Sequence, residues 1–548
     1  MSDKGVKGHL KRDELLVKLN KDRFDILIIG GGATGAGAAL DAATRGLKTA
    51  LVEANDFSSG TSSRSTKLVH GGVRYLENAI KHIDHQEYAL VREALAERKR
   101  FLNNAPHLTT PLAIITPVYG YWEAFYYLVG LKLYDLLAGK ASLGHSRFLS
   151  KKRSIELFPM LKKEGLRGSV LYYDGQFDDA RMNLTLILTA LQKGAVAANY
   201  VRVIKLIKEN DRVVGARVQD EITKETWPIY AKVIINATGS FADTIRHMDD
   251  EKAKDIIEPS QGSHILLPES FASNTFGLII PKTDDGRVLF LLPWQQKILA
   301  GTTDHPAKIS FDPMASALEV DYILTHIAKY FSKPVKRSDI IATFSGLRPL
   351  VKPDHSLNTA SISRDHLINI SPSGLITIVG GKWTTYRKMA EDVINAAISS
   401  EKLSPIGPCV TKDLTLVGGH FFKKTLAKEL MASFDLPEDV SQHLAQSYGD
   451  KAKSVIDNVS KDLMKRLDIG LPYLLAEVVY AVRQEYALHA TDVLARRIRL
   501  AFLDNLSAKK ALPMVVELMA KELKWDKIRI DEELLMGQNF LETMMTRA

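Results

Sequence analysis

Apolar residues along this chain occur in two kinds of stretch, which predict different secondary structures. Short continuous apolar runs, typical of strands buried on both faces, lie at 24–29, 49–53, 232–239 and 375–381. Helical stretches follow or separate these runs, beginning near residues 36 and 384 and covering 81–104 and 182–194. The alternation of strand and helix up to about residue 100 is expected for βαβ units. It predicts a mostly parallel sheet with helices on its faces.

The middle and the end of the chain depart from that alternation. Two strand-like runs, 198–205 and 212–219, are separated by a polar turn. Residues 258–350 alternate short apolar runs with Pro and Gly, which suggests a mostly antiparallel sheet. After Pro408 the chain is mainly helical, with helical signals at 422–434, 472–488 and 491–507. The predicted fold class is therefore α/β with added β and helical parts.

The turn that follows the first predicted strand has the spacing of a dinucleotide-binding motif. Gly30, Gly32 and Gly35 give a GxGxxG pattern between an apolar run and a helix-favouring segment. Glycine has no Cβ, so the backbone can approach a pyrophosphate that lies over the N–H groups of the helix N-terminus. Glu53 ends the second strand, 18 residues beyond Gly35. A carboxylate at that place accepts hydrogen bonds from an adenosine ribose in a Rossmann fold.

Composition restricts the chemistry. The chain has 548 residues, a length that predicts two to four domains. Its residues are 45% hydrophobic and 25% charged, as in ordinary globular proteins. Its single cysteine, Cys409, excludes an intrachain disulfide and any CxxC relay, so redox chemistry must be carried by a cofactor. Residues 1–23 are polar and lack an apolar signal-like core, so we do not expect secretion. The sequence has no zinc-finger spacing, and we expect no metal site.

The formal net charge of +9 would suit an anionic substrate or an anionic lipid surface. Nucleic acid is not expected as a partner, because basic residues are spread along the chain and no RNA-binding signature or basic heptad region is present. No run of 18 apolar residues predicts a membrane span. The nearest is the aromatic-rich stretch 118–137, which Glu123, Lys132 and Asp135 interrupt. We interpret it as a core helix in preference to a membrane-facing one.

A hydroxyl-rich segment follows Glu53. Residues 58–75 read SSGTSSRSTKLVHGGVRY, so that Ser62 and Ser63 offer short hydroxyl donors and Lys67 offers a cation. Such groups could neutralise a pyrophosphate and hold a flavin ring. The segment begins just after Glu53, the predicted ribose-binding carboxylate, and ends with Gly71-Gly72 and the residues that follow them. This position favours a role in cofactor binding over that of a plain linker.

Six segments together resemble one family. They read GGGATGAGAALDAATRG (30–46), SSRSTKLVHGGVRYLE (62–77), GSHILLP (262–268), GTTDH (301–305), SGLRPL (345–350) and GGKWTTYRKMA (380–390). The chain is similar to the FAD-dependent glycerol-3-phosphate dehydrogenase family, from about residue 24 to 545. The resemblance implies FAD as cofactor, oxidation of sn-glycerol 3-phosphate to dihydroxyacetone phosphate, and transfer of the electrons to a membrane quinone.

The resemblance also assigns residues to the cofactor and to the reaction. Oxidising a secondary alcohol needs a base for the hydroxyl proton and a hydride acceptor, and His264 is the base that we favour. Lys382 follows Gly380-Gly381 at a strand end and would add positive charge near the flavin pyrimidine or contact the substrate. The cofactor-binding residues that we expect are Gly30, Gly32, Ala33, Thr34, Gly35, Glu53, Ser62, Ser63, Lys67, Gly239, Gly381, Lys382 and Thr384.

Arginine suits the phosphate of the implied substrate, because its planar guanidinium binds a phosphate through two parallel hydrogen bonds. Arg348 follows a turn and precedes Pro349, which favours a rigid, directed side chain. Arg74, Tyr75 and Arg364 lie in segments similar to the substrate-site segments of the family, although Arg364 would equally suit a surface ion pair with Asp365. We expect Arg74, Tyr75, Arg348 and Arg364 to bind the substrate, with Arg348 also placed in the catalytic set.

The spread of these motifs predicts a discontinuous cofactor domain. We expect an N-terminal extension at 1–23, an FAD-binding domain built from 24–100, 170–250 and 345–400, a substrate domain built from 101–169 and 251–344, and a C-terminal helical domain at 405–548. We further expect peripheral attachment to the cytoplasmic face of the cell membrane. The oligomeric state, monomer or homodimer, stays open.

Two alternatives remain at this point. A glycerol-3-phosphate oxidase would pass electrons to O₂, but oxidases of this family tend to carry an inserted segment that is not evident here. A non-catalytic flavin-binding scaffold for RNA or protein would not need His264, Arg348 and Lys382 beside an intact FAD pocket.

Overall fold

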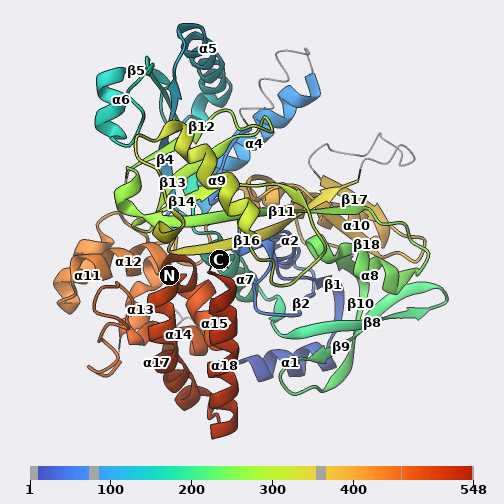
Figure 1. The fold of residues 1–548 in the computed structure, drawn as a ribbon. Coiled ribbons are helices and arrows are strands. Elements are labelled where there is room, and N and C mark those ends of the chain that lie inside the picture. The colour runs from blue at the N-terminus through green and yellow to red at the C-terminus, as the bar shows by residue number, and fades with distance from the viewer. Residues whose placement is uncertain (1–9, 73–84, 274, 353–365, 458, 546–548) are drawn as a thin grey trace.

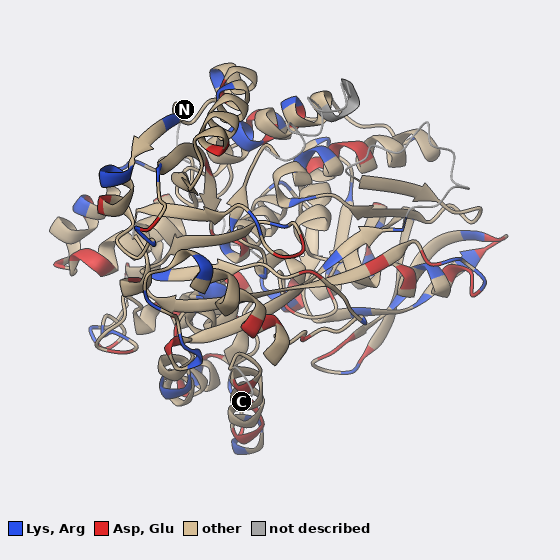
Figure 2. Cartoon of the chain, turned by 45° about the horizontal axis from the view of Figure 1, so that its top comes forward, with Lys and Arg blue, Asp and Glu red and all other residues tan. Residues whose placement is uncertain are grey.

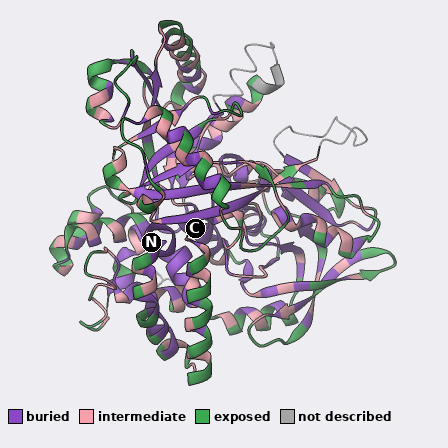
Figure 3. Ribbon diagram, in the orientation of Figure 1, coloured by how far each residue is buried: buried purple, intermediate pink, exposed green. Residues whose placement is uncertain are grey.

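The structure, a computed structural model, describes residues 10–72, 85–273, 275–352, 366–457 and 459–545. Two sheets and a group of C-terminal helices make up the chain (Figure 1). We call the eight-stranded sheet, which contains the first strand, sheet A, and the ten-stranded sheet, sheet B. The strands of both sheets form the buried interior, and exposed residues concentrate on the outlying helices and hairpins (Figure 3).

Sheet A confirms the predicted parallel sheet. Its order is β17-β18-β10-β1-β2-β7, with β8 and β9 joined through β10, and the five strands from β18 to β7 run parallel. Its strands are β1 (Arg23–Ile29), β2 (Thr49–Val52), β7 (Val196–Ala198), β8 (Val201–Glu209), β9 (Arg212–Asp220), β10 (Thr226–Asn236), β17 (His366–Ile370) and β18 (Ile376–Gly380). The central strands are buried on both faces, which explains their continuous apolar runs.

Helices cover sheet A. Helix α2 (Ala33–Thr44) packs between α7 (Asp179–Gln192) and α10 (Tyr386–Ser400), while α8 (Ala242–Asp249) follows β10. The N-terminal extension contains α1 (Arg12–Lys21), which packs against the sheet through the buried Leu15 and Leu19.

Sheet B is antiparallel except for the β12–β4 pair, as the pattern over 258–350 suggests. Its order is β15-β11-β14-β13-β12-β4-β6-β3, with β16 paired to β11 and β5 to β6. The strands are β3 (Leu68–Val69), β4 (Thr109–Val118), β5 (Arg147–Ser150), β6 (Gly168–Phe177), β11 (Ile257–Pro268), β12 (Phe276–Ile280), β13 (Leu289–Trp294), β14 (Lys297–Gly301), β15 (His305–Pro306) and β16 (Ala342–Val351). The helices connected to this sheet are α4 (His85–Asn104), α5 (Tyr121–Ala138), α6 (Lys151–Leu157) and α9 (Ala317–Tyr330).

The C-terminal part is helical, as predicted. It contains α11 (Leu426–Phe434), α12 (Glu438–Tyr448), α13 (Ala452–Ile456), α14 (Leu475–Glu485), α15 (Ala490–Asp492), a π-helical turn (Val493–Arg497), α16 (Leu500–Leu503), α17 (Asn505–Leu523) and α18 (Lys527–Thr543). Its apolar side chains share one core with Leu266, Leu299 and Phe344 of sheet B. The C-terminal helices are therefore packed against the sheet that carries the predicted base.

Two strands lie in a different sheet from the one that the predicted domain pieces suggest. Residues 170–177 and 345–351 were placed with the FAD-binding pieces, yet β6 and β16 pair within sheet B. The next strand in sequence after each of them, β7 and β17, belongs to sheet A, and hydrophobic pattern alone does not tell which neighbour a strand will pair with. The division into domains stays a prediction.

Helix α5 is a surface helix, so the interpretation of 118–137 as a core helix is wrong. Ala124, Leu131, Tyr134 and Ala138 are its buried residues. Tyr127, Leu128 and Leu137 are half-buried, and most of its other apolar side chains are exposed, with Trp122 85% exposed and Leu136 75% exposed. Figure 1 shows α5, β5 and α6 at one end of the molecule, away from the C-terminal helices. Overall composition could not distinguish the two cases, because an aromatic-rich stretch suits either a core or an interface.

Candidate active site

A cavity of about 1270 Å³ lies where the carboxyl ends of the parallel strands of sheet A meet sheet B. Drug-sized ligands occupy pockets of roughly 300–1,000 Å³, so this cavity has room for a larger molecule. Ligands bind at the carboxyl ends of strands in open α/β sheets. The predicted site residues that line this cavity are Gly30, Gly32, Ala33, Thr34, Glu53, Ser62, Gly239, His264, Arg348, Gly381, Lys382 and Thr384.

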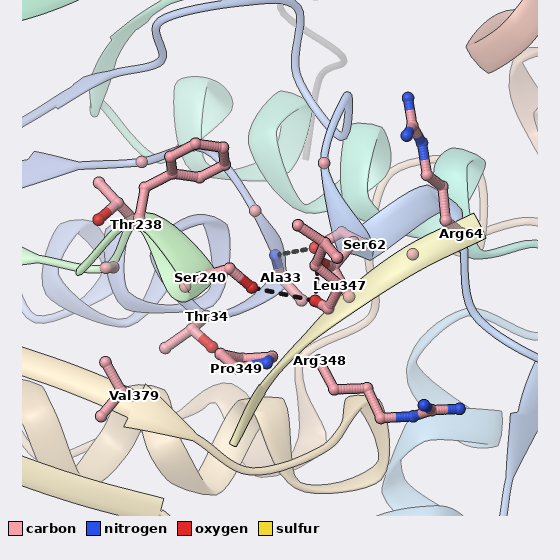
Figure 4. Close-up of a pocket in the computed structure, with 18 of the residues that line it drawn as sticks. Ala33, Thr34, Ser62, Arg64, Thr238, Ser240, Leu347, Arg348, Pro349 and Val379 are labelled. Atoms are coloured by element: carbon pink, nitrogen blue, oxygen red, sulfur yellow. Dashed lines mark hydrogen bonds between the residues drawn. The ribbon is translucent and has the colours of Figure 1, made fainter. Parts of the chain in front are cut away.

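The glycine turn has no room for side chains. Gly30 has φ +107°, and a Cβ there would lie 2.7 Å from the carbonyl oxygen of Ala237. Gly32 is the N-cap of α2, and the N–H of Ala33 donates to Ser62 Oγ at 2.9 Å (Figure 4). The start of α2 therefore faces the cavity, with its positive dipole end available to an anionic group.

Glu53 is held at the end of β2 by the backbone. Its carboxylate accepts hydrogen bonds from the N–H groups of Gly31 at 2.7 Å and Asn55 at 3.0 Å. Burial raises the pKa of Glu53, and these two backbone donors oppose that rise. A carboxylate can accept about four hydrogen bonds, so the oxygens keep acceptor capacity for a ribose hydroxyl.

The turn after β18 joins the cavity to helix α10. Gly380 and Gly381 both have positive φ, at +82° and +70°, and a Cβ on Gly381 would lie 2.2 Å from the sulfur of Met389. Lys382 then precedes the 3-10 turn η7 (Trp383–Thr385), from which α10 starts. Thr384 exchanges hydrogen bonds at 3.3 Å with the backbone of His70. A helix N-terminus and a lysine thus face the cavity, as the sequence predicts.

His264 lies on β11 with its ring buried. The ring stacks on Phe344 with 4.8 Å between centroids, and Nε2 lies 3.0 Å from Thr66 Oγ1. Nδ1 has no hydrogen-bond partner within the described part of the chain. Burial, and then the positive charges of Lys67 and Arg348, hold the pKa of His264 well below its usual value. The imidazole is therefore neutral at physiological pH and able to accept a proton.

Arg348 reaches toward His264 along one face of β11. In the β16–β11 register Arg348 is opposite Ser260, and residues 260, 262 and 264 share a face of the strand. The guanidinium lies over Gly262, where a Cβ would be 2.3 Å from Nη2. Nη2 donates to Thr302 Oγ1 and to the carbonyl of Thr303, both at 3.0 Å. Figure 4 shows the side chain extending from the strand that also carries Leu347.

Three predicted cofactor residues do not line the cavity, and we correct them. Lys67 is fully buried, and its Nζ donates to Asp179 Oδ2 at 2.7 Å, so it cannot neutralise a pyrophosphate directly. Ser63 is buried, and its hydroxyl donates to the carbonyl of Gly60. Gly35 serves the turn itself, since a Cβ there would lie 1.9 Å from the carbonyl oxygen of Gly30. The predicted substrate residues Arg74, Tyr75 and Arg364 lie outside the described residues.

Several residues of the cavity wall were not in the predicted set. Thr66 contacts the predicted base, and Arg64 lines the cavity while pairing with Asp312 at 3.1 Å. Thr302 belongs to the GTTDH segment and holds the guanidinium of Arg348. Thr66 belongs to the hydroxyl-rich segment 58–75 that the sequence analysis singles out as a source of hydroxyl donors. Thr302 lies in a segment that carries the family resemblance, and that resemblance is the signal that could have found it.

Comparisons with known proteins identify the family to which the chain belongs. Residues 25–387 match the family model described as FAD dependent oxidoreductase, and residues 409–530 match that of the C-terminal domain of alpha-glycerophosphate oxidase. A mitochondrial glycerol-3-phosphate dehydrogenase of Homo sapiens is 50% identical over 96% of this chain and 74% of its own length. One of Arabidopsis thaliana is 46% identical over 96% of this chain and 87% of its own length. The crystal structure of glycerol-3-phosphate dehydrogenase from Bacillus halodurans, complexed with FAD, has a TM-score of 0.80, 31% identity and 97% coverage of both chains.

The sheet topology, the glycine turn and the cavity therefore define a FAD-dependent oxidoreductase. Within that class, the identity over nearly the whole length shows the particular family. The chain belongs to the FAD-dependent glycerol-3-phosphate dehydrogenase family, which confirms the resemblance that the sequence motifs carry.

The residues present fit FAD. At Gly30 and Gly381, where the backbone borders the cavity, a Cβ would clash with Ala237 and Met389, so glycine is needed for the backbone to follow this course. The start of α2 is suited to a pyrophosphate, and Glu53 to a ribose. Among the described residues no group of three or more His, Cys, Asp or Glu side chains is arranged to hold a metal ion.

Proposed function

We propose that this chain oxidises sn-glycerol 3-phosphate to dihydroxyacetone phosphate with FAD as its cofactor. One observation carries the proposal: the guanidinium of Arg348 lies over Gly262, on the strand face that also carries the buried His264, whose pKa is held well below its usual value. A substrate with a phosphate at one end and a secondary alcohol next to it matches that pair. The relatives named above carry the same activity in their names.

Each residue has one task in this proposal. Arg348 binds the phosphate and so places the alcohol beside His264. His264 accepts the hydroxyl proton at Nε2, the ring nitrogen that meets the cavity-lining hydroxyl of Thr66. When bound, FAD supplies the acceptor for the hydride that leaves the carbon carrying that hydroxyl group. The start of α10, together with Lys382, provides positive potential at the end of the cavity beyond β18.

The test is anaerobic addition of glycerol 3-phosphate to the flavin-loaded protein. We expect the visible absorbance of the oxidised flavin to bleach at a rate that saturates with substrate concentration. Glycerol, which lacks the phosphate, should bleach it very slowly. Bleaching by neither compound would favour a flavin-binding scaffold and would contradict the proposal.

The acceptor that we propose is a membrane quinone, reached by peripheral attachment. No helix in the described parts of the chain is long and apolar enough to cross a membrane. Helix α5 instead exposes several apolar side chains: Tyr121 by 71%, Trp122 by 85%, Phe125 by 61% and Leu136 by 75%. Exposed basic residues lie on the same lobe, namely Lys132, Lys140, Arg147, Lys151, Lys152 and Arg153. Aromatic insertion with nearby positive charge suits an anionic membrane surface.

Acidic residues are present at this end of the molecule as well, since Arg153 pairs with the exposed Glu156 at 3.0 Å. Figure 2 shows Lys and Arg on all parts of the ribbon, with Asp and Glu among them. The sequence leads us to expect the cytoplasmic face of the cell membrane, whereas the curated relatives are named mitochondrial. The proposal concerns attachment to a quinone-containing membrane in either setting.

Replacing Trp122 and Phe125 with serine should weaken membrane binding. Burial of an aromatic side chain contributes roughly 1.5–3 kcal/mol, so loss of two inserted rings should reduce binding at least about tenfold. Flotation with vesicles that contain anionic lipid measures this directly. High salt should release only part of the wild-type protein. Salt screens the electrostatic attraction to the membrane, beyond about 10 Å already at 0.1 M, but does not remove the contribution of inserted aromatic side chains.

The matched control for this prediction is Phe421→Ser. Phe421 is 82% exposed but lies in the C-terminal part of the chain, so its loss should leave flotation unchanged. Equal flotation of the wild-type protein and the α5 double variant would contradict docking through α5.

A glycerol-3-phosphate oxidase is the second candidate, because residues 409–530 match the family model named for alpha-glycerophosphate oxidase. Stopped-flow reoxidation of the reduced protein distinguishes the two. Faster reoxidation by a ubiquinone or menaquinone analogue than by O₂ supports the quinone acceptor, and the reverse order supports the oxidase.

A further inference from the structure

A group of buried charges lies next to the aromatic ring on which His264 stacks. Lys67 Nζ is 4.9 Å from the ring centroid of Phe344 and 4.9 Å from that of Trp294. The His264 ring is 4.8 Å from the Phe344 ring. The ammonium and the imidazole therefore contact the same phenyl ring, and they are separated by no more than about 10 Å.

Lys67 and Arg499 both bind the carboxylate of Asp179, and Lys67 Nζ also donates to the carbonyls of Ser63 and Ser65. Asp179, at the start of α7, accepts from Lys67 Nζ at 2.7 Å and from Arg499 Nη2 at 3.2 Å. Arg499, from the C-terminal helices, also donates to the carbonyl of Ser63 at 2.7 Å. The three side chains are 0%, 0% and 1% exposed. Burying three charges is unfavourable unless they pair, and apolar residues can often replace such a group without loss of stability.

The backbone at both basic residues is in an unusual conformation. Lys67 and Arg499 have φ of +63° and +62°, in the left-handed region that favours glycine. Arg499 is separated by Ile498 alone from the π-helical turn Val493–Arg497 and is the N-cap of α16. Strained residues and π-helical turns both concentrate at functional sites. The cluster thus combines buried charge, backbone strain and contact with the aromatic partner of the predicted base.

We propose that Lys67, Asp179 and Arg499 form a positioning cluster for His264. Through this cluster the C-terminal helices hold the 63–67 loop and the Phe344 ring, and so fix the imidazole in the orientation that accepts the substrate proton. The inference rests on the proposed function, since it assumes that His264 is the base. It also gives the C-terminal helices a role in the reaction.

One member of the cluster, Lys67, also contributes to the positive charge near His264. Burial lowers the pKa of Lys67 to about 8, and Asp179 limits that fall. Burial acts to raise the pKa of Asp179, yet Lys67 and Arg499 keep it below its usual value. Besides Lys67, the ring of His264 faces the positive charge of Arg348. On its own strand, the neighbouring Ser263 hydroxyl donates to the buried carboxylate of Glu319 at 2.7 Å.

The first experiment compares Lys67→Met with Lys67→Arg. Anaerobic stopped-flow measures the rate of flavin reduction as a function of pH. The measurements are made below about pH 8, where Lys67 is charged, and the acid limb of this profile is the fall in rate at low pH. One charge within about 10 Å, at an effective dielectric constant of about 20, changes a pKa by roughly one unit. Lys67→Met should therefore move the acid limb up by about one pH unit. Lys67→Arg should leave the limb near its wild-type position.

A second readout needs neither flavin nor activity. Diethyl pyrocarbonate modifies neutral imidazole, so the pH dependence of carbethoxylation of the His264 peptide, followed by mass spectrometry in the apoprotein, reports the protonation of that ring. The midpoint should rise in Lys67→Met by the same amount as the acid limb. An unchanged midpoint and an unchanged limb would overturn the proposal.

Arg499→Met is the milder variant, because it leaves the Lys67–Asp179 pair in place. We expect slower flavin reduction, by about tenfold, with normal flavin content, and partial recovery in Arg499→Lys. The control is Arg483→Met, which removes an exposed arginine of the same helices that pairs with Glu522 at 2.7 Å. A normal rate in Arg499→Met would exclude a role for the C-terminal helices.

His264→Gln separates this inference from the proposed function. Normal flavin reduction in His264→Gln would remove the base and with it the premise of the cluster. Slow reduction in His264→Gln, together with wild-type behaviour of the Lys67 and Arg499 variants, would overturn the cluster alone.

Discussion

Replacing His264 with alanine is expected to slow flavin reduction by glycerol 3-phosphate about 10²–10⁴-fold, because general-base catalysis contributes about that factor. The protein should stay folded and yellow, since His264 borders the cavity and its ring is hydrogen-bonded to no described residue other than Thr66. Anaerobic stopped-flow measures the rate. The deficit should shrink at high pH, where hydroxide replaces part of the missing base.

The pH dependence of the wild-type rate follows from the same site. Burial, with the charges of Lys67 and Arg348, holds the pKa of His264 well below its usual value. A base must be unprotonated, so the rate should persist as the pH falls through the ordinary histidine range and decline only below it. An acid limb at or above the ordinary histidine pKa would contradict this environment.

A matched control for His264 is His326→Ala. His326 is also 2% exposed, but it lies on α9 outside the cavity wall and bonds to the carbonyl of Tyr322 and the N–H of Asp284. Its loss should leave the rate of flavin reduction unchanged. If His264→Ala also reduces the flavin at the normal rate, the base lies elsewhere, and Lys382 is the next candidate.

Arg348→Ala should weaken substrate binding far more than flavin binding. Losing a charge-assisted hydrogen-bonded contact with a phosphate costs about 1.5–3 kcal/mol, which lowers kcat/KM by roughly 10- to 100-fold. The flavin content should stay normal. Steady-state kinetics with glycerol 3-phosphate and with glycerol measures the difference, because glycerol should lose little further in the variant.

Arg337→Ala is the control for Arg348. Arg337 pairs with Asp321 at 2.8 Å and does not line the cavity. It should leave kcat/KM near the wild-type value. Equal losses on glycerol and glycerol 3-phosphate in Arg348→Ala would show that the guanidinium does not bind the phosphate.

The sequence alone determined the cofactor half of this protein. The strand–glycine–helix unit around Gly30 and the carboxylate of Glu53 were found in their predicted places. These features are local: apolar runs predict buried strands, and glycine is required where φ is positive or a Cβ has no room. His264 and Arg348 line the same cavity, as motif resemblance predicted, although no local rule brings residues 84 positions apart together.

Only the tertiary structure decided where charged and aromatic side chains point. Lys67 lies in the predicted cofactor loop, yet its left-handed backbone and its partner Asp179 turn it away from the cavity. The outward face of α5 likewise depends on which helix and strands cover its other side. Arg499 donates a hydrogen bond to the carbonyl of Ser63, more than 400 residues earlier in the chain. Each outcome depends on partners supplied by distant segments, and hydrophobic periodicity carries no information about such partners.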